Sequence, residues 1–179
     1  LAPVGNWSML TAAVKAGCNA VYFGIKGINM RAGAANFQLD EIKKVISYCH
    51  ENNVKAFCTV NVIVYEKELE KLDEILLKLK EAKIHAIICW DLAVIKKCKE
   101  LGLEIHLSTQ ASVSNSEAAK QWQEFGVTRI ILARECSLKD IKEIKEKTGL
   151  EIEIFVHGAR CISYSGRCFM SQELFNKSA

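Results

Sequence analysis

The sequence predicts an α/β fold with parallel strands, in the form of an incomplete β/α barrel of the TIM type. Two observations predict it. About seven short apolar runs alternate with amphipathic stretches along the chain, and each run is nearly continuous in apolar character. Continuous apolar strands suit a sheet that is covered on both faces, as parallel sheets are. Alternation of strands and helices indicates that helices make the crossovers between parallel neighbours.

The expected elements follow from the spacing of the apolar residues. The strand candidates are LAPV, AVYFGI, VKAFCTVNV, AIICW, EIHLS, RIILA and EIEIFVH. Helical periodicity covers residues 7–16, 39–52, 66–82, 92–101, 116–125 and 137–147. Four glycines, Gly17, Gly102, Gly126 and Gly149, are placed to end helices. Ser114 or Asn115, and Ser137, are placed to begin them.

Two parallel architectures compete for this pattern. A doubly wound sheet usually carries a glycine-rich phosphate loop after its first strand. Here LAPV is followed by GNWSML, which lacks G-x-G-x-x-G. A complete barrel needs eight βα units and typically about 250 residues. The chain has 179 residues, so we expect a single domain over 1–179 that is a barrel truncated at both ends. An unpaired sheet edge would then favour self-association.

Composition narrows the class of protein. Half of the residues are hydrophobic and 25% are charged, which is typical of a globular domain. The net charge of +3 is too small to indicate nucleic-acid binding by itself. No apolar run approaches the ~20 residues of a membrane span. Eight cysteines without a framework for disulfides favour a reduced, cytoplasmic protein that uses most of them in its core.

Ligands of both architectures bind at the carboxyl ends of the strands. Polar residues follow nearly every predicted strand, so we predict that they form the rim of a substrate site. The substrate-binding candidates are Arg31, Asn36, Asn61, Asp91, Gln110, Asn115, Arg134 and Arg160. The guanidinium groups of Arg31, Arg134 and Arg160 would suit a carboxylate or a phosphate.

Acid–base chemistry is available near the last predicted strand. His157, Glu153 and Glu135 are the catalytic candidates, because imidazole and carboxylate groups transfer protons near neutral pH. Cys161 lies four residues after His157, so a thiol nucleophile assisted by histidine is also formally possible. The sequence contains neither the H-E-x-x-H motif of metallopeptidases nor a G-x-S-x-G elbow.

The segment EIEIFVHGARCISYSGRCFMS, residues 151–171, resembles the signature of peptidase family U32. The matching positions are Glu153, Phe155, Gly158, Ala159, Cys161, Gly166, Cys168 and Ser171. Arg160 departs from the pattern, which prefers an aliphatic residue there. LAPVGN, AVYFG, MRAGAANF, STQASVSN and TRIILARE also resemble the family, so the resemblance covers essentially the whole chain.

The resemblance implies an enzyme with one of two activities. Some family members hydroxylate tRNA, ribosomal RNA or ubiquinone without oxygen and bind a [4Fe–4S] cluster through four cysteines. Cys161 and Cys168 match the first two of these ligands, and the other two would lie past Ala179. The branch that modifies nucleic acid is the more similar one, so we expect tRNA hydroxylation. We expect no cluster bound to these 179 residues alone.

The alternatives are a peptidase that acts on collagen-like chains, as the family name implies, and a folded fragment without activity. RNA or a peptide would be the substrate in the first two cases. Cysteine ligation of iron is consistent with cluster chemistry, and the spacing of Cys161 and Cys168 is not that of a C-x-x-C zinc knuckle.

Overall fold

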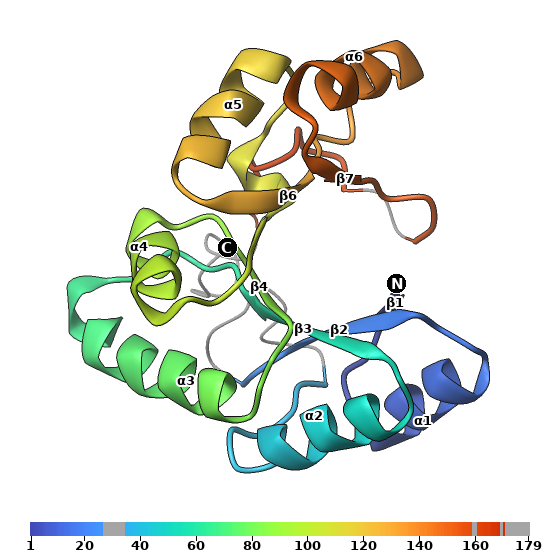
Figure 1. Cartoon of the computed structure of the whole chain (residues 1–179), viewed down its shortest axis with the longest axis vertical. Helices are drawn as coiled ribbons and strands as arrows, with labels where there is room; N and C mark the ends of the chain where they lie inside the picture. Colours follow the sequence, from blue (N-terminus) through green and yellow to red (C-terminus); the bar gives the residue numbers. More distant parts are fainter. Residues whose placement is uncertain (27–34, 159–160, 169, 171–179) are drawn as a thin grey trace. The chain divides into compact units, whose positions relative to one another are not determined.

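The chain is shown in Figure 1 as a computed structural model, which describes residues 1–26, 35–158, 161–168 and 170. It consists of two compact units, Leu1–Glu104 (unit 1) and Ile105–Ala179 (unit 2). In both units, short parallel strands alternate with helices. Every strand candidate predicted from the sequence overlaps an observed strand.

Unit 1 contains four strands that pair in the order in which they occur along the chain. They are β1 (Ala2–Pro3), β2 (Ala20–Gly24), β3 (Lys55–Val60) and β4 (Ala86–Cys89). Each pairs with the next in parallel. All four residues of β4 are buried, as are four of the five in β2. Such strands lie between two covered faces, which explains their continuous apolar sequences.

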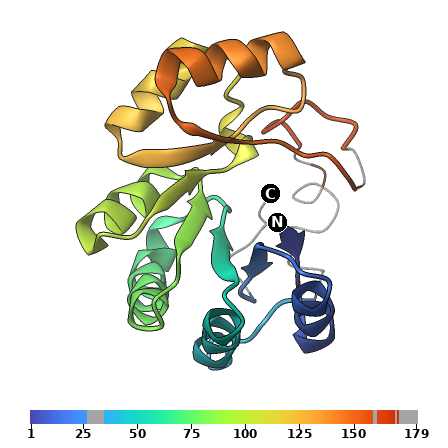
Figure 2. The same cartoon turned by 45° about the vertical axis from the view of Figure 1, so that its right-hand side comes forward.

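The crossovers of unit 1 are helical. They comprise α1 (Trp7–Lys15), α2 (Ile42–Glu51), the 3₁₀ helix η1 (Glu66–Glu68), α3 (Leu69–Glu81) and α4 (Leu92–Leu101). Figure 2 shows α1, α2 and α3 along the same side of the strands. Only one stripe of each helix is buried, for example Leu72, Ile75, Leu76 and Leu79 of α3. Amphipathic helices on one side of parallel strands are the winding of a β/α barrel.

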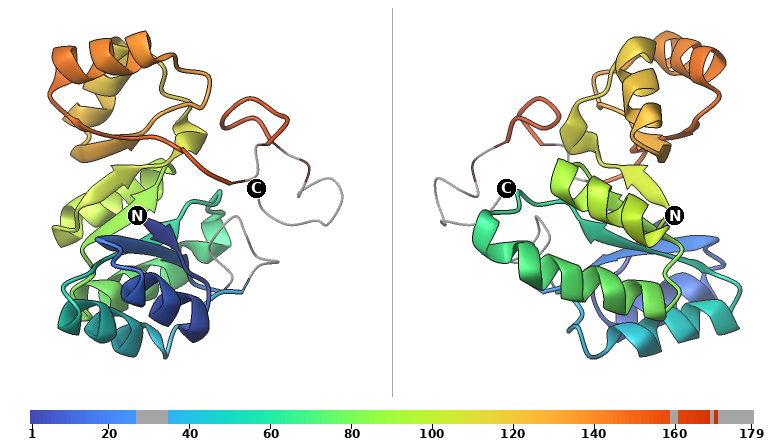
Figure 3. Two further views of the ribbon diagram at one scale, coloured as in Figure 1. Left: turned by 90° about the vertical axis from the view of Figure 1, so that its right-hand side faces the viewer. Right: turned by 60° about the vertical axis from the view of Figure 1, so that its left-hand side comes forward.

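Unit 2 repeats this pattern. Its elements are β5 (Ile105–Leu107), the 3₁₀ helix η2 (Thr109–Ala111), α5 (Ser116–Glu124), β6 (Val127–Ile131), α6 (Leu138–Thr148) and β7 (Glu151–Glu153). The three strands are parallel, and β6 lies between β5 and β7. Figure 3 shows α5 and α6 on one side of β6.

The helix ends confirm the capping residues predicted from the sequence. The side chain of Asn115 accepts a hydrogen bond at the start of α5, and Ser137 forms a capping box with Asp140 at the start of α6. Gly102 and Gly149 end α4 and α6 with φ values of 67° and 69°, where an L side chain would be strained. Local sequence therefore sets the ends of these helices.

The predicted fold class is confirmed: the described residues form seven parallel strands with alternating helices, the pattern of an incomplete β/α barrel. Among the described residues, no helix combines the length and apolar character that crossing a membrane requires.

Candidate functional site

Three predicted rim residues follow the strands of unit 1. Asn36 precedes Phe37, whose bridge to Ile25 extends β2. The carbonyl of Asn61 accepts a hydrogen bond from the indole of Trp90 at 3.1 Å. Asp91 begins α4: its carboxylate accepts from Ala93 N at 2.8 Å and from Val64 N at 3.2 Å. Asp91 therefore holds the ends of β3 and β4 together, whatever its role toward a substrate.

Two predicted residues of unit 2, Arg134 and Glu135, contact residues 161–168, here called the cysteine loop. Arg134 follows β6, and its guanidinium donates to this loop at three points. Nη1 donates to the carbonyl of Cys161 at 3.2 Å, Nη2 to the carbonyl of Ser163 at 2.7 Å, and Nε to the hydroxyl of Ser165 at 3.2 Å. The backbone N–H of Arg134 also donates to the Ser165 hydroxyl at 3.0 Å.

The cysteine loop is also docked on the residues that follow β5. The hydroxyl of Ser112 donates to the carbonyl of Ser165. Gly166 has a φ of +73°, and a Cβ atom there would overlap the carbonyl oxygen of Gln110 and the Ser112 hydroxyl. Because of this close approach, glycine is the residue that position 166 requires. Two segments of unit 2, those that follow β5 and β6, thus fix one loop.

The two thiols of this loop lie together. Cys161 is exposed and Cys168 is half-buried. A hydrogen bond from the backbone N–H of Ser163 and a hydrogen bond with Cys168 are the main causes that lower the pKa of the Cys161 thiol. Burial opposes them, and the charge of Arg134 and a hydrogen bond with it add smaller effects that lower the pKa. Hydrogen bonds and positive charge favour the thiolate, which is the form that binds metals.

The other cysteines differ sharply from this pair. Cys49, Cys58, Cys89 and Cys98 are buried, as the sequence predicts for core residues, while Cys18 and Cys136 are half-buried. Burial, with a smaller effect of Cys18, raises the pKa of Cys49 to about 11. Buried thiols of this kind stay protonated and inert. Among the cysteines of the described residues, Cys161 is the exposed one.

Glu135, a predicted catalytic residue, also contacts the loop. Its Oε1 accepts the backbone N–H of Ser165 at 3.0 Å. Burial opposes ionisation of this carboxyl, but hydrogen bonds from Ser165 and from its own backbone N–H, together with the charge of Arg134, lower its pKa. Glu135 is therefore a carboxylate that anchors the loop at neutral pH.

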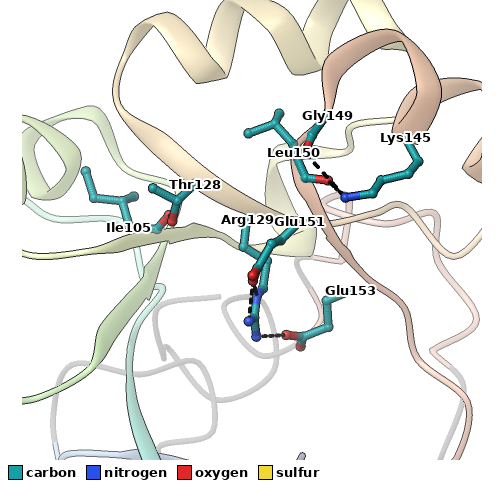
Figure 4. A network of polar contacts seen from close by, with 8 residues as sticks. All are labelled: Ile105, Thr128, Arg129, Lys145, Gly149, Leu150, Glu151 and Glu153. Carbon is teal, nitrogen blue, oxygen red and sulfur yellow. Dashed lines mark hydrogen bonds and ion pairs between the residues drawn. The ribbon is translucent and has the colours of Figure 1, made fainter.

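Glu153, the other predicted carboxylate, lies on β7 beside Glu151. Both contact Arg129 of β6, as Figure 4 shows. Arg129 Nε donates to Glu151 Oε2 at 2.8 Å, and Nη1 donates to Glu153 Oε2 at 3.4 Å. Burial raises the pKa of Glu153, and Arg129 only partly offsets this. A carboxyl with a raised pKa can hold a proton closer to neutral pH, as a general acid or base must.

The remaining predicted residues do not join the cysteine loop through side-chain contacts described for them. His157 is exposed beyond the end of β7. Asn115 caps α5, and the Gln110 side chain accepts from Ser108. Arg31 and Arg160 lie outside the described residues.

Sequence reasoning missed the polar residues that hold the site together, namely Ser112, Ser163, Ser165 and Arg129. One signal was available for Arg129, because a charged residue inside the apolar run TRIILA needs a buried partner. The serines carry no such signal, since a serine in a loop is ordinary and its contacts here come from distant segments.

Comparison with known sequences identifies a matching protein family and several relatives of the chain. Residues 5–179 match the profile of peptidase family U32. The chain is 44% identical to an uncharacterized protease of Methanocaldococcus jannaschii, over 100% of this chain and 45% of the relative. It is 37% identical to a collagenase of Porphyromonas gingivalis, covering 100% and 46%. It is 39% identical to tRNA hydroxylation protein P1 of Bacillus subtilis, covering 97% and 42%.

The chain thus spans less than half the length of these relatives. Among solved structures, it resembles the U32 peptidase Mk0906 with a TM-score of 0.71 at 12% identity, over 86% of this chain and 66% of that one. At that identity the likeness shows the fold alone. The profile match, which spans nearly all of the chain and includes both thiols of the cysteine loop, decides the family: the chain belongs to peptidase family U32.

Proposed function

We propose that the chain is part of a cytoplasmic enzyme that hydroxylates RNA, most specifically tRNA, without oxygen, and that Cys161 and Cys168 are ligands of its [4Fe–4S] cluster. The observation that carries the proposal is the contact between these two thiols in a docked loop. The B. subtilis relative named as a tRNA hydroxylation protein supports the substrate. So does an Escherichia coli relative, 34% identical, named 23S rRNA 5-hydroxycytidine C2501 synthase.

The donor set fits half of such a cluster. Cluster iron is held by thiolates, usually four. The cysteine loop offers two sulfurs in contact, and the thiolate form of Cys161 is favoured there. Within the described part of the chain, no group of three or more His, Cys, Asp or Glu residues could hold a metal. Two further cysteine ligands would therefore come from residues outside this set.

The bound cluster would supply one-electron chemistry. The residues of this chain would position the cysteine loop, hold a proton and contact the substrate. Arg134 and Glu135 hold the loop in place. Glu153 can hold a proton on its carboxyl group, because burial raises its pKa. Arg129 keeps this carboxyl oriented from the neighbouring strand. Arg31 and Arg160 remain candidates for contacting phosphate, since guanidinium binds it in a bidentate manner.

Variants of the complete protein test the proposal in cells that lack the native gene. Cys161→Ser and Cys168→Ser should each abolish the hydroxylated nucleoside in tRNA, measured by mass spectrometry of nucleosides. Cys136→Ser is the matched control, because Cys136 is half-buried outside the loop and should leave the modification intact. A full level of modified tRNA in the Cys161→Ser strain would contradict the proposal.

A second candidate is a peptidase that acts on collagen-like chains, which the P. gingivalis collagenase relative favours. In this version, the exposed Cys161 thiol would be the nucleophile. The described partners of that thiol are Ser163, Cys168 and Arg134, and His157 is not among them. Cleavage of gelatin that is lost in Cys161→Ala would support the peptidase, and cleavage that persists would remove its thiol mechanism.

A further inference from the structure

We propose that Arg134 is a positioning residue that holds Cys161 and Cys168 as a preformed two-thiol chelate before any metal binds. The inference deepens the proposed function, on which it rests for the identity of the bound group. The preformed pair itself follows from contacts among the residues of unit 2.

The first argument is the geometry of the guanidinium fork. Nη1 and Nη2 of Arg134 donate to two carbonyls of the same loop, those of Cys161 and Ser163. A planar group that binds two acceptors fixes their relative orientation, which a flexible ammonium cannot do. These carbonyls belong to the peptide units 161–162 and 163–164, so the fork orients the backbone that follows the first thiol.

The second argument is the anchor at Ser165, which lies between the two cysteines in the sequence. Its side chain is buried, with a relative exposure of 4% for the residue. The hydroxyl accepts from Arg134 N and Nε, its N–H donates to Glu135, and its carbonyl accepts from Ser112. Every polar group of Ser165 therefore has a partner outside the loop. The loop is fixed at its middle as well as at its first cysteine.

The third argument concerns the N–H donors of Arg134 that remain available to a substrate. A guanidinium has five N–H donors in a fixed fork. Three donor nitrogens of Arg134 bind the cysteine loop. A residue used in this way holds the site in shape, and phosphate recognition would fall to other cations. The geometry therefore assigns to Arg134 a role different from the substrate contact that its sequence position indicates.

Preformation has a measurable consequence. Two thiols held side by side react with a bidentate reagent as one site, because the second thiol is present at a high effective concentration once the first has reacted. A loop that must first be ordered loses part of that advantage. The probe is phenylarsine oxide, which condenses with two thiols to form two As–S bonds and releases one water.

The experiment measures capture of phenylarsine oxide by the reduced 179-residue chain, using intact mass and peptide mapping. A Cys161→Ser/Cys168→Ser variant gives the background from other cysteines. Arg134→Gln should weaken capture at the pair by about tenfold, the scale expected when preorganisation is lost. Arg134→Lys keeps the charge but lacks the guanidinium fork. Its capture of phenylarsine oxide should be closer to that of Arg134→Gln than to that of the wild type.

The matched control is Arg167→Gln. Arg167 is exposed and adjacent to Cys168, and the contact described for it is a backbone hydrogen bond to Tyr164. Its substitution likewise removes one positive charge near the two thiols, so capture should stay within about twofold of the wild type if geometry, rather than charge, is decisive. Thermal unfolding reports whether each variant keeps its fold. Glu135→Gln, which weakens the acceptor of the Ser165 N–H, is measured alongside. Should Arg134→Gln unfold, Arg134→Lys replaces it.

The outcomes separate this inference from the proposed function. Unchanged capture in a folded Arg134→Gln chain, or an equal loss in Arg167→Gln, overturns the positioning role, even if the complete protein holds a cluster. Weakened capture in Arg134→Gln and Glu135→Gln, with Arg167→Gln unaffected, supports it. In that case, a complete protein without iron would overturn only the identity of the bound group.

Discussion

Arg129 Nη1 lies 3.4 Å from Oε2 of Glu153, yet this ion pair does not give the carboxyl an ordinary pKa. Desolvation of Glu153 outweighs the attraction of Arg129. Arg129 also serves Glu151, to which Nε and Nη2 donate. Because Arg129 is shared between two carboxylates, it does not offset the burial of Glu153, whose pKa stays raised. This relationship makes Glu153 an acid–base candidate of unit 2.

The raised pKa predicts a pH dependence of stability. A carboxyl whose folded pKa lies above its unfolded value, 4.5, binds more protons in the folded state. Its contribution is therefore fully present below pH 4.5 and is lost as the pH rises through the folded pKa. Glu153→Gln cannot ionise and should lose less stability over this range. In urea unfolding from about pH 4 to pH 7, the free energy of unfolding of the variant should rise relative to that of the wild type. A constant difference between the two would contradict the raised pKa.

Substitution of Gly166 should disturb the cysteine loop alone. Alanine at this position would meet the Gln110 carbonyl and the Ser112 hydroxyl, and its φ of +73° adds about 1 kcal/mol of backbone strain. Gly149→Ala is the matched control, because its φ is +69° and no atom lies within 4 Å of the added Cβ. Gly166→Ala should impair capture of phenylarsine oxide, whereas Gly149→Ala should only lower the free energy of unfolding. Normal capture by Gly166→Ala would show that the loop is not docked as described.

Two substitutions of Asp91 should distinguish its structural role as a helix cap from a role in substrate binding. As the N-cap of α4 it should tolerate Asn, which caps helices equally well, whereas Asp91→Ala should lower the free energy of unfolding by about 1 kcal/mol. A substrate contact that needs the negative charge would instead be lost in both variants. Denaturant unfolding, combined with tRNA modification in cells by the complete protein, distinguishes the two. Asp91→Asn with wild-type stability and no modified tRNA would identify Asp91 as a site residue.

The hydrogen bond of His85 should make the stability of unit 1 sensitive to acid. Its Nδ1 accepts the backbone N–H of Ala56 at 3.1 Å, which requires the neutral ring. Burial, His50 and Lys55 lower its pKa below 6.5. A lowered histidine pKa contributes stability above the unfolded pKa of 6.5, and this stability is lost as the pH falls toward the folded pKa. His85→Asn keeps an acceptor that does not titrate, so its stability should fall less in mild acid. Parallel pH profiles of the two proteins would contradict this.

The sequence predicted the strands and helices well because their signals are local. The continuous apolar run of β4, the amphipathic period of α3 and the caps at Asn115 and Ser137 all depend on neighbouring residues. The same locality placed Arg134 and Glu135 at the end of a strand, which needs only the chain order and the rule that sites lie at carboxyl ends. Cys161 and Cys168 were predicted as ligands from the resemblance of their segment to the family signature.

Contacts between distant segments were beyond local reasoning. Ser112 is 53 residues from Ser165, and nothing in either neighbourhood predicts their hydrogen bond. Arg134 had the features of a substrate-binding cation, but its role depends on carbonyls 27 and 29 residues away. The tertiary fold, rather than residue type, decides whether a cation holds a loop or a ligand.

The most direct test of the central claim is the iron and sulfide content of the complete protein, purified without oxygen, together with its visible spectrum. The account predicts about four irons and four sulfides per chain for a [4Fe–4S] cluster, with the visible absorption lost in both Cys161→Ser and Cys168→Ser. Protein that contains no iron, or a cluster that persists in both variants, would contradict it.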